Sequence, residues 1–251
     1  MSITVPVDQQ DDDEKVEIAN VEGSAPPIQV EFVEPTIGDK MFRTGNLGDR
    51  IVTRGGSSAD CTLISAGNQT AIAAAYDFGL QGHELPTNVA ETFAAKWQVD
   101  AGRLWGRCAD TRNAATDMMK GGKCNHLVLL APPQDYTTTG GDVVKKDAVD
   151  ILSRVMVNGD RMHHAHPVTS LVALACAAAA KGTVAQRLLE QCGCEIDHSK
   201  LETVGLRVGH PGGVMTVLAK YDKARGEVVS AGFVRTARIL MEGDVYVGPL
   251  L

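Results

Sequence analysis

The stretch M-H-H-A-H-P-V-T-S-L-V-A-L-A-C-A-A-A-A-K-G, from Met162 to Gly182, decides the fold of this chain. Between Val168 and Ala180 it has no charge and no polar face, so we expect a helix that is buried on every side rather than amphipathic. Its many small residues let strands come close around it. The pattern therefore predicts a curved antiparallel sheet wrapped around one central helix.

The start of this helix allows two interpretations. Pro167 is followed by Thr169 and Ser170, a beginning that leaves backbone N–H groups and hydroxyls free to hold an anion. The alternative is a core helix with a well-capped start and no ligand. On the first interpretation, the histidine-rich approach and the helix start together predict a carboxylate or phosphate site.

The histidines and a close cysteine pair are also candidate metal ligands. Cys192 and Cys194 are separated by a single residue, and they lack the two-residue spacer and the second pair of a zinc ribbon. We therefore predict no metal site there, and none at His163, His164 and His166.

Composition excludes several classes of partner. The 251 residues include 31 acidic and 24 basic side chains, which gives a net charge of -7, and only 4% are aromatic. Without a basic stripe or stacking aromatics, we expect no nucleic acid partner. The apolar run Leu171–Ala180 is too short to span a bilayer, and the first residues do not form a signal peptide. We expect a cytoplasmic protein with reduced cysteines and no membrane contact.

Periodicity predicts the other elements. Ile28–Glu34 alternates apolar and polar residues, and His126–Leu130 is apolar, so both are predicted strands. We also predict one interrupted strand over Cys61–Ile72, helices over Glu91–Asp117 and Asp147–Val157, and a closing antiparallel meander with Gly-rich turns. This order is α+β and differs from the regular alternation of a doubly wound sheet.

Two further groups of polar residues are candidates for binding an anion. In Ser65-Ala-Gly-Asn-Gln-Thr70, the glycine permits close backbone approach and the next three side chains offer hydrogen bonds suited to a carboxylate. The alternative there is a strand bulge with an Asn turn. Arg235 and Arg238 are spaced to lie near one face, where they would attract an anionic substrate or form salt bridges with the surplus carboxylates.

Taken together, several blocks resemble the PrpF family of methylaconitate and aconitate isomerases, which have a diaminopimelate-epimerase-like fold. The blocks occur in the family's order over nearly the whole chain. They are Ile28–Pro35, Met41–Asn46, Ser65–Thr70, Ala131–Tyr136, His163–Ala165 with the Ala-rich helix, Gly209–Gly213 and Arg235–Gly243.

The resemblance implies two domains, each a sheet wrapped on a central helix, with the active site between them. The family moves a double bond or changes cis–trans geometry in small unsaturated tricarboxylates, by proton transfer next to a carboxylate and without metal or organic cofactor. One set of residues must hold the carboxylates and the developing negative charge. The resemblance assigns that role to Gly67, Asn68, Gln69, Thr70, Thr169 and Ser170.

The chain departs from the family where the acid–base pair is expected. The family's Ser-Thr-Ser-Lys and Asn-Cys-Gly-Asn segments, whose Lys and Cys transfer the proton, have no counterpart here. The segment Lys123-Cys124-Asn125 lies in a different block. In addition, Arg43 and Gln69 both stand where the family has Pro. We therefore expect no catalytic residue in this chain, which would carry only the second-domain half of the site and turn over poorly or not at all by itself.

The same resemblance predicts the domain organisation. We expect a second domain over residues 46–231, with its central helix over 168–181, and remnants of a first domain, truncated at the N-terminus, at 1–45 and 232–251. The strands Ile28–Glu34 and Phe233–Val247 would pair there and expose apolar surface. A homodimer or a separate N-terminal half would then be the partner. Three functions compete: an isomerase supplied with Lys and Cys, a carboxylate-binding protein without turnover, and a fragment without a separate role.

Overall fold

The computed structural model describes residues 1–5, 15–37, 40–42, 44–52, 58–89, 126–157, 161–194, 203–222, 224–225 and 227–244. In chain order, its elements are β1 (Ser2–Thr4), β2 (Val16–Glu17), β3 (Ser24–Ala25), β4 (Ile28–Val33), β5 (Asp49–Val52), β6 (Ser58–Ala66), β7 (Asn68–Ala74), the 3-10 helix η2 (Ala75–Phe78), β8 (His126–Ala131), β9 (Tyr136–Thr137), β10 (Val143–Val144), the 3-10 helix η3 (Lys146–Ala148), β11 (Ile151–Val157), β12 (Arg161–Met162), α4 (Val168–Ala179), α5 (Val184–Gln191), β13 (Thr203–His210), β14 (Gly213–Asp222) and β15 (Glu227–Arg235).

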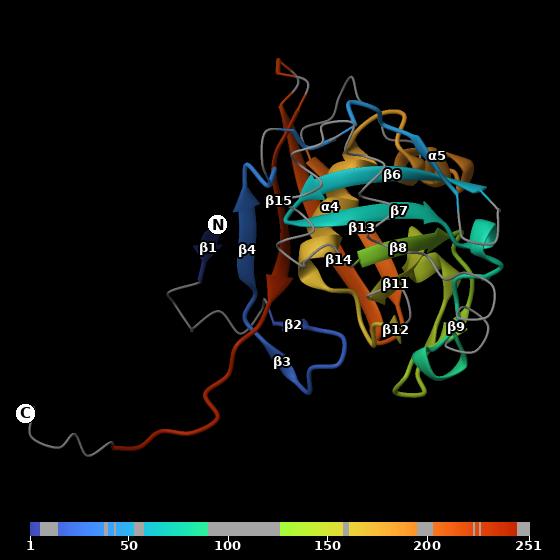
Figure 1. Cartoon of the computed structure of the whole chain (residues 1–251). Helices are drawn as coiled ribbons and strands as arrows, with labels where there is room; N and C mark the ends of the chain where they lie inside the picture. Colours follow the sequence, from blue (N-terminus) through green and yellow to red (C-terminus); the bar gives the residue numbers. More distant parts are fainter. Residues whose placement is uncertain are drawn as a thin grey trace, which may run out of the picture.

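One eleven-stranded sheet curves around α4 (Figure 1). Its order is β1–β4–β15–β14–β13–β11–β8–β7–β6–β5, and β12 pairs with β11. Neighbouring strands are antiparallel except for two parallel pairs, β7 with β8 and β11 with β13. The predicted α+β architecture, a sheet wrapped around an apolar helix, is therefore confirmed. The sheet continues through β15 across the expected boundary at residue 231, and the division into two domains stays a prediction.

Helix α4 forms the centre of the core. Every side chain from Ser170 to Ala179 is buried, as the absence of a polar face predicts. It packs against β6, β7, β14 and β15 on the inside of the sheet and against α5. Burying one large aliphatic side chain contributes about 1.5–3 kcal/mol, so tertiary packing rather than intrinsic propensity holds this alanine-rich helix in place.

The prediction of a helix over Asp147–Val157 is wrong. This stretch forms part of η3 and then β11, an inner strand between β8 and β13. Ile151 and Val155 pack on the α4 side, whereas Leu152 and Met156 pack on the other side of the sheet. A strand buried on both faces has a near-continuous apolar run, and periodicity alone does not separate such a run from a helix.

Three other predicted elements change or cannot be compared. Cys61–Ile72 is a hairpin of β6 and β7 rather than one interrupted strand, since Ala66 pairs with Asn68 across the turn. The strand predicted over Phe233–Val247 ends at Arg235, and residues 236–244 have no regular secondary structure. The helix predicted over Glu91–Asp117 lies outside the described residues. By contrast, β4 and β8 confirm the strands predicted over 28–34 and 126–130.

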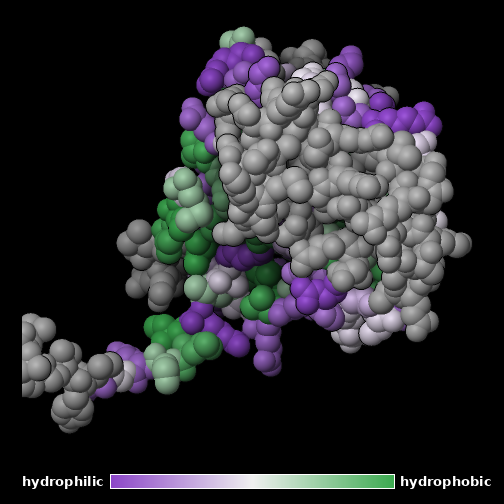
Figure 2. All heavy atoms as spheres, viewed as in Figure 1, coloured by the Kyte–Doolittle hydropathy of each residue, from purple (hydrophilic) through white to green (hydrophobic). Residues whose placement is uncertain are grey.

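Apolar side chains are exposed on one side of the molecule. Figure 2 shows them over β1 and β4 and along the segment that follows β15. Ile3 and Val33 are about half exposed, and the run Ile239–Met241 is more than 80% exposed. Apolar exposure of this kind on strand 28–34 and beyond β15 agrees with the expectation from the sequence.

No single helix in the described ranges is long and apolar enough to cross a membrane. Helices α4 and α5 meet that criterion only as a pair, and they are bent by 69° at the break between them.

Thr183 joins α4 to α5. Its Oγ1 accepts a hydrogen bond from the amide of Gln186 at 3.2 Å, which caps α5, and donates one to the carbonyl of Ala177 at 2.6 Å. Nearby, the hydroxyl of Thr62 on β6 accepts from the amide of Val184 at 2.9 Å. Two threonine hydroxyls thus satisfy the backbone groups where both helix ends are buried against the sheet.

Replacing Thr183 with Ala is expected to lower the free energy of unfolding by about 1–2 kcal/mol, because the substitution removes the cap of α5 and one of the two donors to the buried carbonyl of Ala177. Chemical denaturation checks this value. Thr183→Ser keeps the hydroxyl and is the matched control, which should retain most of the stability. Equal losses in both variants would show that the methyl group, not the cap, matters.

Candidate functional site

The inward face of the sheet changes from apolar to polar at the edge near the start of α4. Alternate side chains of a strand point to the same face, so this change can be followed along each strand. On β7, Ile72 and Ala74 pack against α4, and the preceding inward positions are Thr70 and Asn68. The same change gives the set that we call the polar rim: Asn68, Thr70, His126 on β8, His210 on β13 and Arg235 on β15.

Gly67 brings the β6–β7 turn against the first turn of α4. Its φ is +63°, a backbone conformation that residues other than glycine rarely adopt. A Cβ built there would lie 3.0 Å from the carbonyl oxygen of Thr169 and 3.1 Å from the side chain of Val172. Two predicted segments, 67–70 and 169–170, are therefore neighbours in space. Thr70 is also opposite His126 in the parallel register of β7 and β8.

The first turn of α4 has unsatisfied backbone donors. No side chain among the described residues caps it, and the amides of Val168, Thr169 and Ser170 precede the first intrahelical bond, from Leu171 to the carbonyl of Pro167. The hydroxyl of Ser170 donates to the same carbonyl at 3.1 Å, so it is not the free donor that the sequence suggested. The N-terminal amides and the helix dipole remain suited to an anion.

The other predicted residues differ in what they offer. Asn68 is held in place: its Oδ1 accepts from the amide of Gln69 at 2.8 Å, and its Nδ2 donates to Nδ1 of His126 at 3.1 Å. The second N–H of Asn68 Nδ2 takes no part in these two hydrogen bonds. The hydroxyl of Thr70 is buried and has no partner in the described part of the chain. Gln69, on the outward register of β7, is not part of the polar rim.

His166 and His210 are two buried imidazoles with complementary roles. The Nδ1 of His166 lies 3.1 Å from the carbonyl of Pro167, and because a carbonyl only accepts, this nitrogen carries the hydrogen. The Nδ1 of His210 accepts from the amide of Gly212 at 3.1 Å, so its hydrogen is on Nε2. Neither Nε2 atom has a partner in the described structure. The site therefore contains one unused acceptor, on His166, and one unused donor, on His210.

Both rings are neutral near pH 7. Burial lowers the pKa of His166 to about 3 and that of His210 to about 4, from an ordinary value of 6.5. The neighbouring imidazoles and, for His210, the guanidinium groups of Arg154 and Arg235 lower these pKa values further. Burial is also the main cause that lowers the pKa of His126. His163 contributes to the lowered pKa of all three rings, and His166 is also affected by His126 and His210, so these imidazoles form one electrostatic cluster.

Arg235 brings a positive charge to the polar rim. Its guanidinium stacks over the ring of Phe233, 4.7 Å from the centroid, and is half buried. Within the described residues it forms no ion pair and donates only to the carbonyl of the adjacent Val234, at 3.3 Å. Arg238 also lacks an ion pair there and donates to the carbonyl of Glu22. The salt bridges that the sequence favoured for these two arginines are therefore not formed among the described residues.

His126 and His210 are not among the residues predicted from the sequence, whereas Arg235 is, together with Arg238, as a candidate for attracting an anionic substrate. A usable signal exists, because V-G-L-R-V-G-H places His210 in phase with three apolar inward positions of β13. The same alternation on β15 puts Arg235 in phase with Phe233. That these positions meet at one edge is decided by strand order and register, which the local pattern does not contain.

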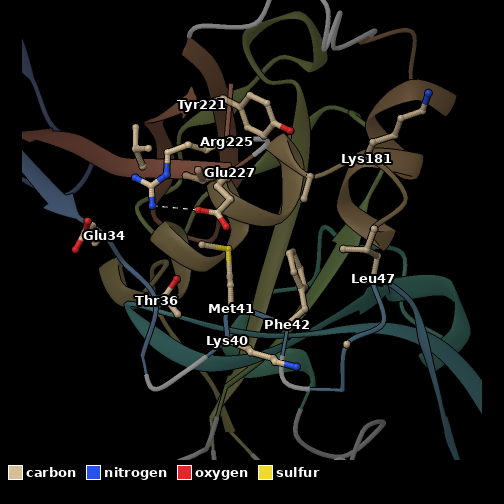
Figure 3. A pocket seen from close by; sticks show the side chains of 14 residues that line it. Glu34, Thr36, Lys40, Met41, Phe42, Leu47, Lys181, Tyr221, Arg225 and Glu227 are labelled. Atoms are coloured by element: carbon tan, nitrogen blue, oxygen red, sulfur yellow. Dashed lines mark ion pairs between the residues drawn. The ribbon is translucent and has the colours of Figure 1, made fainter. Parts of the chain in front are cut away.

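A cavity of about 870 Å³ lies at the other end of α4, beside Ala180 and Lys181. Figure 3 shows Arg225 and Glu227 facing one another there, 3.4 Å apart, with Lys40 and Lys181 pointing away from that pair. The C-terminal end of a helix dipole disfavours anions, and the cations here are not gathered. We therefore place the candidate anion site at the polar rim and not in this cavity.

Other chemistry finds little support in the described ranges. No group of three or more His, Cys, Asp or Glu side chains is placed there to hold a metal ion. Cys61 and Cys176 are buried and form no disulfide, and burial raises the pKa of Cys176 to about 12. Burial also raises the pKa of Cys192 and Cys194. Cys176, Cys192 and Cys194 are therefore not thiolates near pH 7.

The fold and the candidate site define an α+β protein whose sheet encloses a helix and places polar groups around the start of that helix. The family profile described as PrpF protein matches residues 1–248, and the chain belongs to this family. Its structure is similar to that of a crystallised methylitaconate-delta-isomerase, with a TM-score of 0.73 and 22% identity over 94% of this chain and 62% of that one. The resemblance seen in the sequence and the fold class are thus both confirmed.

Curated relatives carry isomerase names. The chain is 32% identical over 241 residues to a 2-methyl-aconitate isomerase of Shewanella oneidensis and 30% identical over 240 residues to a 3-methylitaconate isomerase of Eubacterium barkeri. A (4E)-oxalomesaconate Delta-isomerase of Novosphingobium sp. is 28% identical over 238 residues. These matches cover 92% of the chain and 58%, 59% and 57% of the respective relatives. The chain thus spans somewhat under two thirds of their length.

Gly67→Ala is expected to weaken the contact between the β6–β7 turn and α4, because the new Cβ meets the carbonyl of Thr169. The matched control is Gly141→Ala, which also has positive φ, +93°, but no atom within 4 Å of the new Cβ. Both variants carry backbone strain of about 1 kcal/mol, and Gly67→Ala should lose about 1–3 kcal/mol more. Urea unfolding measures both, and equal losses would contradict the close approach.

Stability should fall as the pH drops below about 6.5. The unfolded chain binds protons at His166 and His210 there, whereas the folded chain does not until about pH 3–4, so each adds a slope of up to about 1.4 kcal/mol per pH unit. Above pH 6.5 both rings are neutral in the folded and the unfolded chain, so this loss of stability is absent there. Denaturation between pH 4 and 7 measures the slope.

In His166→Asn and His210→Asn, the amide group replaces the Nδ1 contact of each ring without titrating, so each variant should flatten the slope. His164→Asn removes an exposed histidine and is the control. An unchanged slope in both buried-site variants would mean that the rings titrate normally.

Proposed function

We propose that this chain forms the carboxylate-binding part of an isomerase that acts on small unsaturated tricarboxylates of the aconitate and methylaconitate type. The single observation that carries the proposal is the uncapped start of α4 surrounded by the polar rim. The names of the relatives, which act on related unsaturated acids, support it. The expected binding residues remain 67–70, 169 and 170, and the polar rim adds His126, His210 and Arg235.

In this proposal, one substrate carboxylate lies at the start of α4. The amides of residues 168–170 donate to its oxygens, and Asn68, oriented by Gln69 and His126, donates from the side. When a proton leaves the carbon next to that carboxylate, negative charge develops on the same oxygens. Donors that are already fixed in a buried site stabilise this charge without reorganising, which is how such sites lower the barrier.

The residues that transfer the proton are proposed to come from elsewhere. Cys176, Cys192 and Cys194 have raised pKa values and are neutral thiols near pH 7, and the family's acid–base segments have no counterpart here. Catalysis by proton transfer needs an acid and a base on either side of the carbon. A further polypeptide segment of the family fold or a second copy of the chain would supply them, and the apolar surface over β1 and β4 is compatible with such a partner.

A second candidate function is carboxylate binding without turnover. The raised pKa values of Cys176, Cys192 and Cys194 favour binding without turnover for the chain alone. The two functions share one binding site and differ in whether the bound acid exchanges its C–H protons with solvent.

Isothermal titration of the purified chain with trans-aconitate, followed by NMR of the acid in D2O, tests the proposal. We expect saturable binding without deuterium incorporation by the chain alone. Exchange that survives substitution of Cys108, Cys124 and Cys176 would contradict the external origin of the acid–base pair. Absence of binding would contradict the carboxylate site itself.

Two variants of Thr169 that differ only in charge test the position of the site. Thr169→Asp puts a carboxylate beside the amides of α4, where it favours the helix but competes with the ligand, so affinity for trans-aconitate should fall about 10-fold or more. Thr169→Asn has the same shape without the charge and is the control. Equal affinities in the two variants would place the carboxylate away from α4.

A further inference from the structure

We propose that Arg235 and His210 form a second carboxylate subsite beside the start of α4, which makes the site select dicarboxylates over monocarboxylates. This inference rests on the proposed function, in which the amides of α4 hold the first carboxylate. The second carboxylate of the ligand would then bind at a separate position that carries a positive charge.

Arg235 has the features of a guanidinium kept for an anion. Lys145, Arg207, Lys220 and Arg225 each pair with a carboxylate at 2.7–3.4 Å. Arg235 is more buried than these four, yet it has no carboxylate partner in the described residues. A partly buried charge without a partner is unfavourable, and a bound carboxylate would compensate it through two parallel hydrogen bonds.

The stacking on Phe233 fixes where this guanidinium lies. Phe233 belongs to the core around α4, and the two side chains point to the same face because they are two residues apart on β15. The Phe233 ring also contacts Phe32 of β4, with centroids 6.2 Å apart. A flat cation that is already held on a fixed ring can bind a ligand with little further loss of side-chain entropy.

His210 supplies a neutral donor at the end of β13, two strands away from Arg235 in the sheet order. It is 1% exposed, its Nδ1 is occupied by Gly212, and its Nε2–H has no acceptor in the described structure. Burying an unsatisfied donor is costly, and a carboxylate oxygen is the acceptor that a ligand held by Arg235 would bring to it. An imidazole N–H and a guanidinium together match the two oxygens of one carboxylate.

The two subsites are adjacent but distinct. His210 ends β13 and Arg235 ends β15, with β14 between them in the sheet, whereas the first carboxylate is proposed to lie on the amides of 168–170. His166, immediately before Pro167, interacts electrostatically with His210 and so connects the two positions.

The test compares itaconate with methacrylate, which keeps the unsaturated carboxylate and lacks the second one. Titration calorimetry of the full chain should show wild-type protein binding itaconate about 10-fold or more tightly than methacrylate. Arg235→Gln should remove that preference by weakening itaconate alone, and Arg235→Lys should retain part of it. Arg225→Gln, which removes an exposed arginine at the other end of α4, is the control and should change neither affinity. Thermal unfolding of each variant confirms that it is folded.

The possible outcomes separate this inference from the proposed function. If wild-type protein binds neither acid, the carboxylate site and this subsite are both wrong. If it binds both acids equally, or if Arg235→Gln weakens both by the same factor, the first site stands and the second subsite is wrong. Selective loss of itaconate in Arg235→Gln, with partial rescue by Arg235→Lys, supports the subsite.

Discussion

The rest of the structure depends on the burial of α4 on all sides by a single sheet. A helix that is enclosed in this way must be apolar around its circumference, and the strands that enclose it must place apolar residues at every inward position along its length. At its first turn this requirement reverses, because three backbone amides have no intrahelical acceptor and Pro167 provides no side-chain cap. The surrounding inward positions are then polar.

This reversal accounts for the site. The strands that pack Ile72, Val208 and Phe233 against the helix continue by one more inward position to Thr70, His210 and Arg235. Core and site are thus two parts of the same alternating pattern, separated by one repeat. Among the buried side-chain groups that have no partner in the described residues, those on Thr70, His166 and His210 lie where the helix presents its own unsatisfied donors. Polar atoms retained at such a cost are typical of a binding site rather than of a core.

Parts of this arrangement could be predicted locally and parts could not. The buried helix, strand Ile28–Val33 and the family were recognisable, because each rests on a continuous pattern or an ordered set of motifs. The helix proposed over Asp147–Val157 failed since an inner strand with both faces buried loses its alternation. Gly67 and Thr169 were proposed for the same role, yet only the hairpin between β6 and β7 explains why they touch.

The sequence by itself determined that one alanine-rich helix had to be enclosed, that its start was rich in polar groups, and that the chain belongs to a family with a sheet wrapped around such a helix. These follow from composition and spacing along a short stretch. The tertiary structure decided which distant residues complete the site. His126, His210 and Arg235 belong to strands far apart in the sequence, and only strand order and register bring their inward-facing side chains to the same end of α4.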